Sequence, residues 1–395
     1  MNLNVSKLEH ENAFKVLSEV KKLEASGKKI INLCIGQPDF NPSKNIIKSA
    51  INALETKTHG YSETKGLIEL RDCISKQYLK NFNIKIDTNN ILITPGAKPI
   101  LFFVISILSK QSSEILIPNP GFPIYKSIVK YSGSKAIYYS LKEDNNFDIR
   151  ADDIIEKVND KTKLIIINSP SNPTGSIIKV KEIVKLLKFL RKYPNIYVLS
   201  DEIYSRIIFN KINFVSFVKF KNLFKNLIIM DGLSKSYAMT GWRLGWGIFP
   251  DEIIEKAEKF CVNTFSCVNN FTQYAAIEAL SGPQTNTSKM VKSFYNRSKI
   301  ITRGLNEING FSCKSPSGAF YCYPNIKKTG YDADFIEKLL LNKLGIAVLS
   351  GNNFGENNEN HIRISYASKE QNLKTALKIM KSFFNKWMIL ILHIM

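Results

Sequence analysis

The sequence predicts an α/β protein with a large domain, built on a mostly parallel sheet between helices, and a second, smaller α+β domain. The chain has 395 residues, more than one hydrophobic core usually supports, and its 44% hydrophobic residues can fill a large interior. Short apolar, β-branched runs alternate with amphipathic helical stretches as far as about Pro283, which is typical of parallel strands joined by crossover helices. Beyond Pro283 this alternation gives way to helices mixed with short strands.

The predicted elements can be placed in order along the chain. Six strands of the large domain are expected at residues 91–93, 115–117, 164–167, 196–199, 227–230 and 244–249. The smaller domain is expected to have a long helix at 287–305, strands at 319–323, 346–349 and 362–366, and a last helix from Lys369. We therefore divide the chain into an N-terminal arm that packs with the small domain (1–45), the large domain (46–285), the small domain (286–386) and an apolar tail (387–395).

The strongly basic composition raises the question of an anionic partner. The formal charge is +21, from 55 Lys+Arg against 34 Asp+Glu. The lysines are scattered along the whole chain, however, and no run combines dense basic residues with aromatic side chains that stack on bases. We interpret most of them as a solvated surface, and we expect neither nucleic acid nor a membrane as a partner.

Cysteine usage and the chain ends indicate a reducing, cytoplasmic setting. None of the six cysteines forms a C-x-x-C pair and most lie in apolar segments, which favours buried free thiols over disulfides and predicts no metal site. Residues 1–15 lack the apolar core of a secretory signal. The apolar stretch 387–395 is well short of the ~20 residues that a spanning helix needs.

Four polar clusters directly follow apolar runs of the predicted sheet, at residues 94–99, 168–175, 200–204 and 231–236. Ligands of parallel α/β sheets bind beyond the carboxyl ends of the strands, so these clusters are expected to converge on one site. The first opens a helix, and the backbone N–H groups of Gly96 and Ala97 suit a phosphate there. Alone, three of the four have an ordinary interpretation: a strand-to-helix turn at 94–99, a terminal charge at Asp201, and one lysine among many at Lys235.

Three motifs together are specific enough to suggest a family. They are Ser234-Lys235-Ser-Tyr-Ala-Met-Thr-Gly-Trp-Arg243, Asn168-Ser-Pro-Ser-Asn-Pro-Thr-Gly175 and Ser200-Asp-Glu-Ile-Tyr204. From about Asn12 to about Phe384 the chain resembles the class I/II aminotransferases, aspartate aminotransferase-like enzymes of the fold-type-I pyridoxal-phosphate-dependent family. The resemblance implies a seven-stranded sheet, pyridoxal 5'-phosphate as cofactor, and transamination between an L-amino acid and a 2-oxo acid.

The resemblance implies three catalytic residues. Lys235 matches the lysine that holds the cofactor as a Schiff base, the internal aldimine, and then moves the substrate proton; a lowered pKa makes its amine a suitable base. Asp201 matches the carboxylate that keeps the pyridine nitrogen protonated, so that the ring can accept electrons. Tyr204 matches a group that hydrogen-bonds the phenolic oxygen of the cofactor, a role that Asn172 shares.

The resemblance also implies residues that bind the cofactor and the substrate. Those expected to hold the phosphate are Gly96, Ala97, Lys98, Ser234 and Arg243. Phe122 falls where the family stacks an aromatic ring on the pyridine, although a core phenylalanine after a strand is the alternative interpretation. Arg363, an arginine inside an apolar strand, matches the clamp for the substrate α-carboxylate. Gly36 and Asn172 complete the expected substrate site, Gly36 within a loop (36–40) that closes over the substrate.

Assembly and the choice of donor follow from two further positions. Tyr61 matches a tyrosine that reaches the cofactor phosphate of a neighbouring subunit, which implies a homodimer with sites at the interface. Lys98 matches a lysine that binds the distal carboxylate in an aspartate-specific branch of the family. The Ser and Thr that assist it there fall at Glu11 and Ala13 here. The resemblance therefore leaves aspartate or another dicarboxylic donor open.

Parts of the sequence are also compatible with other functions. The same fold and lysine chemistry would also serve a carbon–sulfur lyase or a decarboxylase-like enzyme, and only the pocket decides between them. The segments Ser127–Lys130, Ser132–Lys135 and Lys328–Gly330 mimic elements of serine acyl-transferring enzymes, but no S-D-N element accompanies them. A regulator on this fold would carry a fused DNA-binding segment, for which the 45 residues before the first large-domain helix leave no room.

Overall fold

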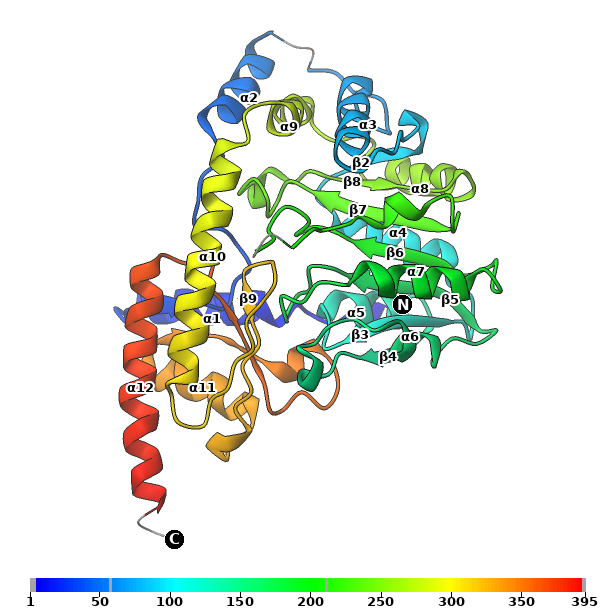
Figure 1. Cartoon of the computed structure of the whole chain (residues 1–395). Coiled ribbons are helices and arrows are strands. Elements are labelled where there is room, and N and C mark those ends of the chain that lie inside the picture. The colour runs from blue at the N-terminus through cyan, green and yellow to red at the C-terminus, as the bar shows by residue number, and fades with distance from the viewer. Residues whose placement is uncertain (1–4, 57–58, 210–211, 393–395) are drawn as a thin grey trace.

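A seven-stranded sheet forms the centre of the large domain (Figure 1). The computed structural model describes residues 5–56, 59–209 and 212–392, with residues 386–392 described by their backbone alone. The strand order is β2-β8-β7-β6-β5-β3-β4, and β8 runs antiparallel to both its neighbours whereas the other neighbouring pairs are parallel. The strands are β2 (Ile91–Thr94), β3 (Glu114–Asn119), β4 (Lys135–Ser140), β5 (Thr162–Asn168), β6 (Tyr197–Asp201), β7 (Leu227–Gly232) and β8 (Gly245–Ile248).

Helices cover both faces of this sheet, because successive side chains of a strand point to opposite sides. In β5, Leu164 and Ile166 pack in a core with α4, α5 and α8, whereas Ile165 and Ile167 pack in a second core with α2, α3, α6, α7 and α9. All four β5 side chains are fully buried. The helices are α2 (Lys44–Thr56), α3 (Ile68–Phe82), α4 (Lys98–Leu108), α5 (Pro123–Tyr131), α6 (Ala151–Ile155), α7 (Val180–Leu190), α8 (Asp251–Thr264) and α9 (Asn270–Ser281).

The smaller domain has its own core and a three-stranded antiparallel sheet of order β11-β12-β9. Its long helices α10 and α12 lie side by side in Figure 1. The N-terminal arm joins this domain, because its strand β1 (Ile31–Asn32) pairs parallel with β10. The remaining elements are α1 (Asn12–Ala25), α10 (Thr285–Asn306), β9 (Tyr321–Cys322), α11 (Ala333–Leu344), β10 (Ile346–Ala347), β11 (Leu349–Ser350), β12 (Ile362–Ser365) and α12 (Glu370–Leu392).

The fold confirms the predicted α/β class and the six predicted strands of the large domain, and it adds β4, which the sequence analysis did not identify. Residues 387–392, set apart above as a tail, continue α12 without a break, while 393–395 lie outside the described residues. The six cysteines are free thiols, five of them buried. Within the described part of the chain, no helix has the length and apolarity to cross a membrane.

Candidate active site

A cavity of about 470 Å³ brings together most of the residues that the sequence analysis selected. The polar clusters after β2, β5, β6 and β7 all contribute to its wall, as the strand-end argument predicted. The predicted residues that line it are Gly36, Ala97, Lys98, Phe122, Asn172, Asp201, Tyr204, Ser234, Lys235, Arg243 and Arg363. Gly96 lies directly behind the wall, against Arg243, and Tyr61 is not among the lining residues.

Lys235 presents a half-buried amine to this cavity from the segment after β7. Its Nζ donates a hydrogen bond to the backbone carbonyl of Gly36 at 2.6 Å. Burial lowers the pKa of Lys235 to about 8, and the nearby carboxylate of Glu11 opposes this shift. A substantial fraction of the amine is therefore neutral near physiological pH, and a neutral amine can act as a nucleophile or a base.

Asp201 is the last residue of β6 and its carboxylate is buried at the cavity. One oxygen accepts a hydrogen bond from the Tyr125 hydroxyl at 2.6 Å, and the other accepts one from the backbone N–H of Ile203 at 3.2 Å. Burial raises the pKa of Asp201 to about 6, although both hydrogen bonds and the charge of Lys235 act to lower it. A cationic group of a bound ligand would stabilise the charged form of this carboxylate.

The turn before α4 forms a cradle with Arg243. Gly96 has a φ of +79°, and a Cβ there would lie 2.2 Å from Nη2 of Arg243, so the glycine is required at this position. The guanidinium donates hydrogen bonds to the backbone carbonyls of Thr240 at 3.0 Å and Pro95 at 3.2 Å. Beside the N-terminus of α4, this arrangement suits an anionic group.

Arg363 enters the cavity from β12 of the small domain and is buried. Its Nη1 donates to Oδ1 of Asn172 at 3.0 Å, and its Nη2 donates to the backbone carbonyl of Cys34. The guanidinium lies 4.5 Å from the ring centre of Tyr321 and 4.9 Å from that of Phe354. Its Nε has no hydrogen-bond partner among the described residues. A buried donor without a partner is costly, and a carboxylate ligand would satisfy it.

Three residues at this site were not selected from the sequence. Tyr125 donates the hydrogen bond to Asp201 described above. It lies in the same short segment as Phe122, so the sequence pattern that indicated Phe122 could also have indicated Tyr125. Tyr321 shares a hydrogen bond of 2.9 Å with the hydroxyl of Tyr204. Asn168 accepts a hydrogen bond from the backbone N–H of Asn172 at 2.7 Å and so fixes the start of that loop.

The side chain of Lys98 does not point into the cradle. Its ammonium pairs with the carboxylate of Glu11 at 2.5 Å and lies 5.5 Å from the ring centre of Phe122 and 5.7 Å from that of Phe14. Glu11 and Ala13, the two positions where the family's aspartate-specific branch has Ser and Thr, both line the cavity. The contribution of Lys98 to the cradle is thus limited to its backbone at the start of α4.

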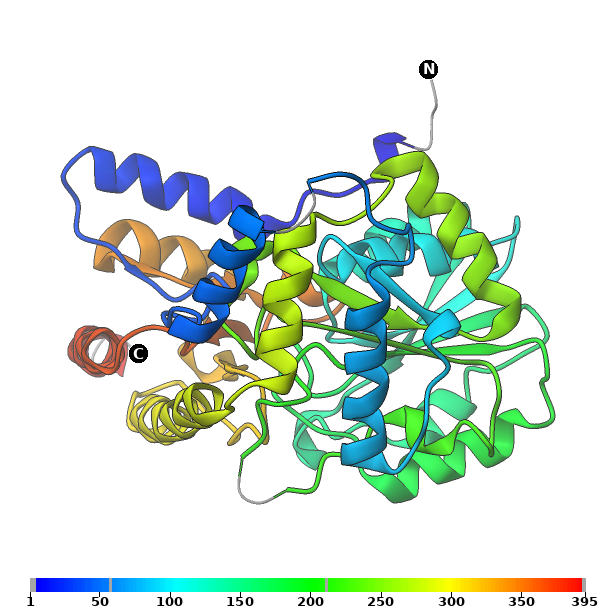
Figure 2. The same cartoon turned by 90° about the horizontal axis from the view of Figure 1, so that it is seen from above.

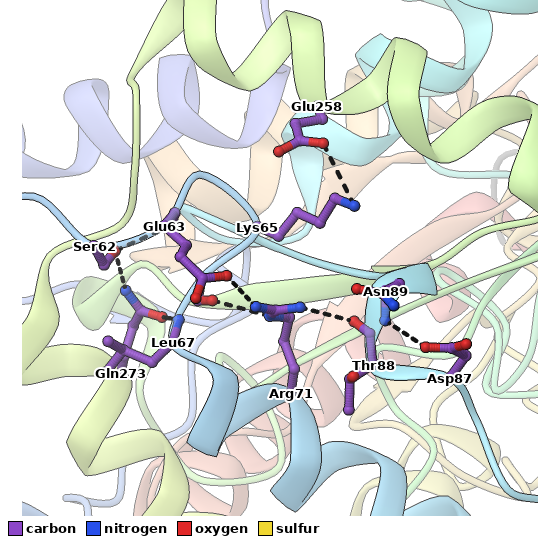
Figure 3. A network of polar contacts seen from close by, with 11 residues as sticks. Ser62, Glu63, Lys65, Leu67, Arg71, Asp87, Thr88, Asn89, Glu258 and Gln273 are labelled. Carbon is purple, nitrogen blue, oxygen red and sulfur yellow. Dashed lines mark hydrogen bonds and ion pairs between the residues drawn. The ribbon is translucent and has the colours of Figure 1, made fainter.

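Tyr61 lies outside the cavity and is 90% exposed. The loop that follows it is nevertheless held firmly by the buried Arg71, which donates to the backbone carbonyls of Gly66 at 3.0 Å and Thr88 at 3.2 Å and pairs with Glu63 (Figure 3). Gln273 of α9 adds a hydrogen bond from its amide to Ser62 and accepts one from the backbone N–H of Leu67. These contacts fix the loop while leaving the Tyr61 side chain exposed.

Glu202, the neighbour of Asp201, faces the opposite side of β6 and does not line the cavity. Its Oε1 accepts hydrogen bonds from Ser200 at 2.9 Å and from the backbone N–H of Phe217 at 3.0 Å. Burial raises the pKa of this carboxyl to about 8, so it is mostly protonated at neutral pH.

Replacement of Glu202 by Gln is therefore expected to change the pH dependence of stability. Between the pKa of Glu202 in the unfolded chain and its pKa of about 8 in the folded protein, the folded state holds a proton that the unfolded chain has released. The contribution of Glu202 to the free energy of unfolding therefore falls as pH rises toward about 8 and is constant above that pH. The Glu202→Gln variant should lack this slope of roughly 1.4 kcal/mol per pH unit. Urea unfolding of both proteins at pH 6, 7, 8 and 9 measures the difference; equal slopes would show that Glu202 is ionised at neutral pH.

The residues around the cavity fit pyridoxal phosphate. A buried carboxylate at Asp201 suits a protonated ring nitrogen, the cradle around Gly96 suits a phosphate, and Lys235 supplies the amine that an aldehyde requires. The unpartnered Nε of Arg363 suits the carboxylate of an amino acid. The cavity volume is typical of a small-molecule site.

Comparisons with known proteins agree with this assignment. Residues 28–380 match the protein family described as "Aminotransferase class I and II". The chain is 38% identical over 374 residues to the (5-formylfuran-3-yl)methyl phosphate transaminase of Methanocaldococcus jannaschii, covering 94% of this chain and 96% of that protein. It is 39% identical over 361 residues to a probable aspartate aminotransferase of the same organism, covering 90% of this chain and 93% of that protein.

The crystal structure of an aromatic aminotransferase from Pyrococcus horikoshii OT3 superposes with a TM-score of 0.87 at 33% identity, over 93% of this chain and 99% of that one. The chain therefore belongs to the class I and II aminotransferases, the pyridoxal-phosphate enzymes with the aspartate aminotransferase-like fold.

Proposed function

We propose that this aminotransferase exchanges amino groups between an L-amino acid and a 2-oxo acid at the cavity described above, with Lys235 as the group that moves the proton. The observation that carries the assignment is the meeting of three charged groups, on the half-buried Lys235 and the buried Asp201 and Arg363, in one cavity of about 470 Å³. Bound pyridoxal phosphate supplies an electron sink that makes the Cα–H bond of the substrate acidic.

The residues of the chain would divide the remaining tasks. Asp201 holds a proton on the ring nitrogen of the cofactor, and Tyr204 and Asn172 bond its phenolic oxygen. Phe122 packs on the ring. Arg363 binds the substrate α-carboxylate through its planar guanidinium, already oriented by Asn172 and by the ring of Tyr321. The residues proposed to bind the cofactor phosphate are Gly96, Ala97, the backbone of Lys98, Ser234 and Arg243.

A panel of amino donors tests the reaction itself. Transamination converts the absorbance of the bound cofactor to that of its amine form without release of ammonia. Each donor is mixed with the holoenzyme in the absence of a 2-oxo acid, and both the spectrum and the free ammonia or thiol are followed. Stoichiometric conversion without release supports transamination, whereas release of ammonia or thiol without conversion would favour the lyase alternative.

We also propose a homodimer in which Tyr61 reaches the cofactor phosphate of the partner subunit. Two apolar stripes run along α2: Ile46, Ala50 and Ala53 are buried, while Ile47, Ile51 and Leu54 are exposed. The exposed stripe has helical i, i+4, i+7 spacing, and Leu54 shares a surface hollow with Tyr61 and Phe271. An exposed apolar face beside a firmly held loop supports an interface between subunits.

Subunit mixing would test the dimer and the role of Tyr61 together. Tyr61→Phe is expected to weaken cofactor binding by roughly tenfold, since it removes one hydrogen bond to a charged group. A mixture of Tyr61→Phe with Lys235→Ala subunits, unfolded and refolded together, should regain sites of wild-type affinity, because one site of each mixed dimer receives both intact residues. If Tyr61 serves its own subunit, mixing restores no such site, and a monomer in analytical ultracentrifugation would also contradict the proposal.

A further inference from the structure

The ion pair between Glu11 and Lys98 lines the cavity, and neither charged side chain has a part in the proposed binding of the cofactor or of the α-carboxylate. Glu11 is the residue before α1 (Asn12–Ala25), at the N-cap position, where Asp, Asn, Ser or Thr side chains commonly cap a helix. Its carboxylate caps nothing and instead lies 2.5 Å from Nζ of Lys98. Glu11 is the more buried partner, with 18% of its side chain exposed against 45% for Lys98.

The charges of the cavity leave Lys98 as the only lining cation without an assigned ligand among the described residues. Arg243 belongs to the phosphate cradle, Arg363 to the α-carboxylate, and Lys235 to the reaction itself. A second carboxylate on the substrate would thus depend on Lys98. Glu11 already neutralises that ammonium, and a second carboxylate placed there would lie next to the carboxylate of Glu11. Like charges brought together in a partly buried site repel strongly.

The surroundings of the pair suit an uncharged side chain. Lys98 lies between the rings of Phe14 and Phe122, and Ala13 and Ile35 line the cavity as well. The arm that carries Glu11 is held in place by a second ion pair, between Glu9 and Lys130 at 2.5 Å. Figure 2 shows this arm, in dark blue, passing from the large domain to α1 on the small domain. Glu11 is therefore a fixed part of the cavity wall.

We propose that Glu11 determines substrate specificity by neutralising Lys98, so that the enzyme prefers amino acids with uncharged side chains over dicarboxylic ones. This inference rests on the proposed function, because it takes Arg363 as the clamp for the α-carboxylate. Glu11 also raises the pKa of Lys235, but that effect is the same for every donor, so the preference between donors depends on the substrate side chain. Removal of the Glu11 charge frees Lys98 to bind a second carboxylate and leaves the remaining charged groups of the cavity in place.

The test compares dicarboxylic with uncharged donors in the holoenzyme. The rate constants for aspartate and glutamate, and for leucine and phenylalanine, are measured with the wild type, Glu11→Gln and Glu11→Ser. Either substitution should raise kcat/KM for the dicarboxylic donors at least about tenfold, and change it for the uncharged donors by less than about threefold. Glu9→Gln is the matched control, since it removes the neighbouring ion pair outside the main cavity but keeps the hydrogen bond from the Glu9 backbone N–H to the Ser127 hydroxyl at 2.8 Å, which also holds the arm, and it should leave the preference unchanged.

Binding of maleate, an unreactive dicarboxylate, gives a second readout that is independent of turnover. Its Kd, measured by calorimetry on the holoenzyme, should fall about tenfold in Glu11→Gln, and the gain should disappear in the double variant Glu11→Gln/Lys98→Gln. Unchanged dicarboxylate kinetics and unchanged maleate binding in Glu11→Gln would overturn the specificity role. A failure of the proposed function looks different, because then no donor of either class converts the cofactor in any of the proteins.

Discussion

Replacement of Lys235 by Ala is expected to lower the rate of transamination by roughly 10⁴-fold or more, the upper end of what one positioned acid–base group contributes. The variant should also lose the absorbance band near the boundary between the ultraviolet and the visible range, since that band arises from the cofactor bound to this amine. The cavity offers no substitute, because Lys98 is engaged by Glu11. Stopped-flow spectra and steady-state rates measure both effects. A variant with undiminished transamination would refute the mechanism.

The half-buried position of Lys235 also predicts the pH dependence of cofactor capture by the apo-protein. Only the neutral amine reacts with an aldehyde, and burial lowers its pKa to about 8. The rate of capture should therefore rise with pH up to about 8 and level off above it, whereas the rate for an exposed lysine would still increase at pH 10.

Added methylamine should restore part of the turnover of Lys235→Ala but not of a variant that is misfolded, which separates loss of the amine from loss of the fold.

Replacement of Asp201 by Asn should lower kcat/KM by roughly 10²–10³-fold, the usual cost of removing one preorganised electrostatic group from an active site. Asn has nearly the same shape as Asp and can still accept the hydrogen bond from the backbone N–H of Ile203. It cannot hold a proton on the ring nitrogen of the cofactor by charge. Single-turnover kinetics with a good donor measure the chemical step directly, and a loss confined to KM would show that Asp201 only binds.

Tyr125→Phe is the matched control for Asp201, because it removes one hydrogen bond to the carboxylate and leaves its charge. The Tyr125 hydroxyl helps to lower the pKa of Asp201 against the effect of burial. Its loss should therefore move the acid limb of the pH–rate profile to higher pH, with a much smaller loss of rate at pH 8. An unchanged acid limb would mean that another group controls activity on that side.

The sequence predicted the large domain well because its strands are buried on both faces and appear as continuous apolar runs. β4 was missed because it lies at the edge of the sheet, where Tyr139 is the one buried residue of its six, and because Ile137 is the one β-branched residue of Lys135–Ser140. One strand expected at 346–349 is two short strands, since Ile346 and Ala347 pair with β1 while Leu349 and Ser350 pair with β12. Elements of two residues are too short for periodicity to separate.

The cavity was predictable where its residues follow strands, and less so where it is formed by packing between the domains. Asp201 and Lys235 follow the strand-end rule for parallel sheets. The contact of Tyr321 with Tyr204 depends on how the small domain lies against the large one, which no local pattern encodes. The pairing of Glu11 with Lys98 is of the same kind, because it joins the N-terminal arm to the start of α4. The strand-end clusters therefore located the site, and the motifs that carry the resemblance indicated the reaction more closely than the substrate.

The pairing of β1 with β10 also has a consequence for how the protein folds during synthesis. Ile31 is made early, but its partner Ile346 leaves the ribosome only when most of the chain is complete. Contacts between residues so distant in sequence form slowly, because a long loop must close before they are gained. The large domain can form its sheet before β10 is available to pair with β1 of the arm. We expect nascent chains that lack the small domain to expose this arm, and to depend on chaperones until the last strands arrive.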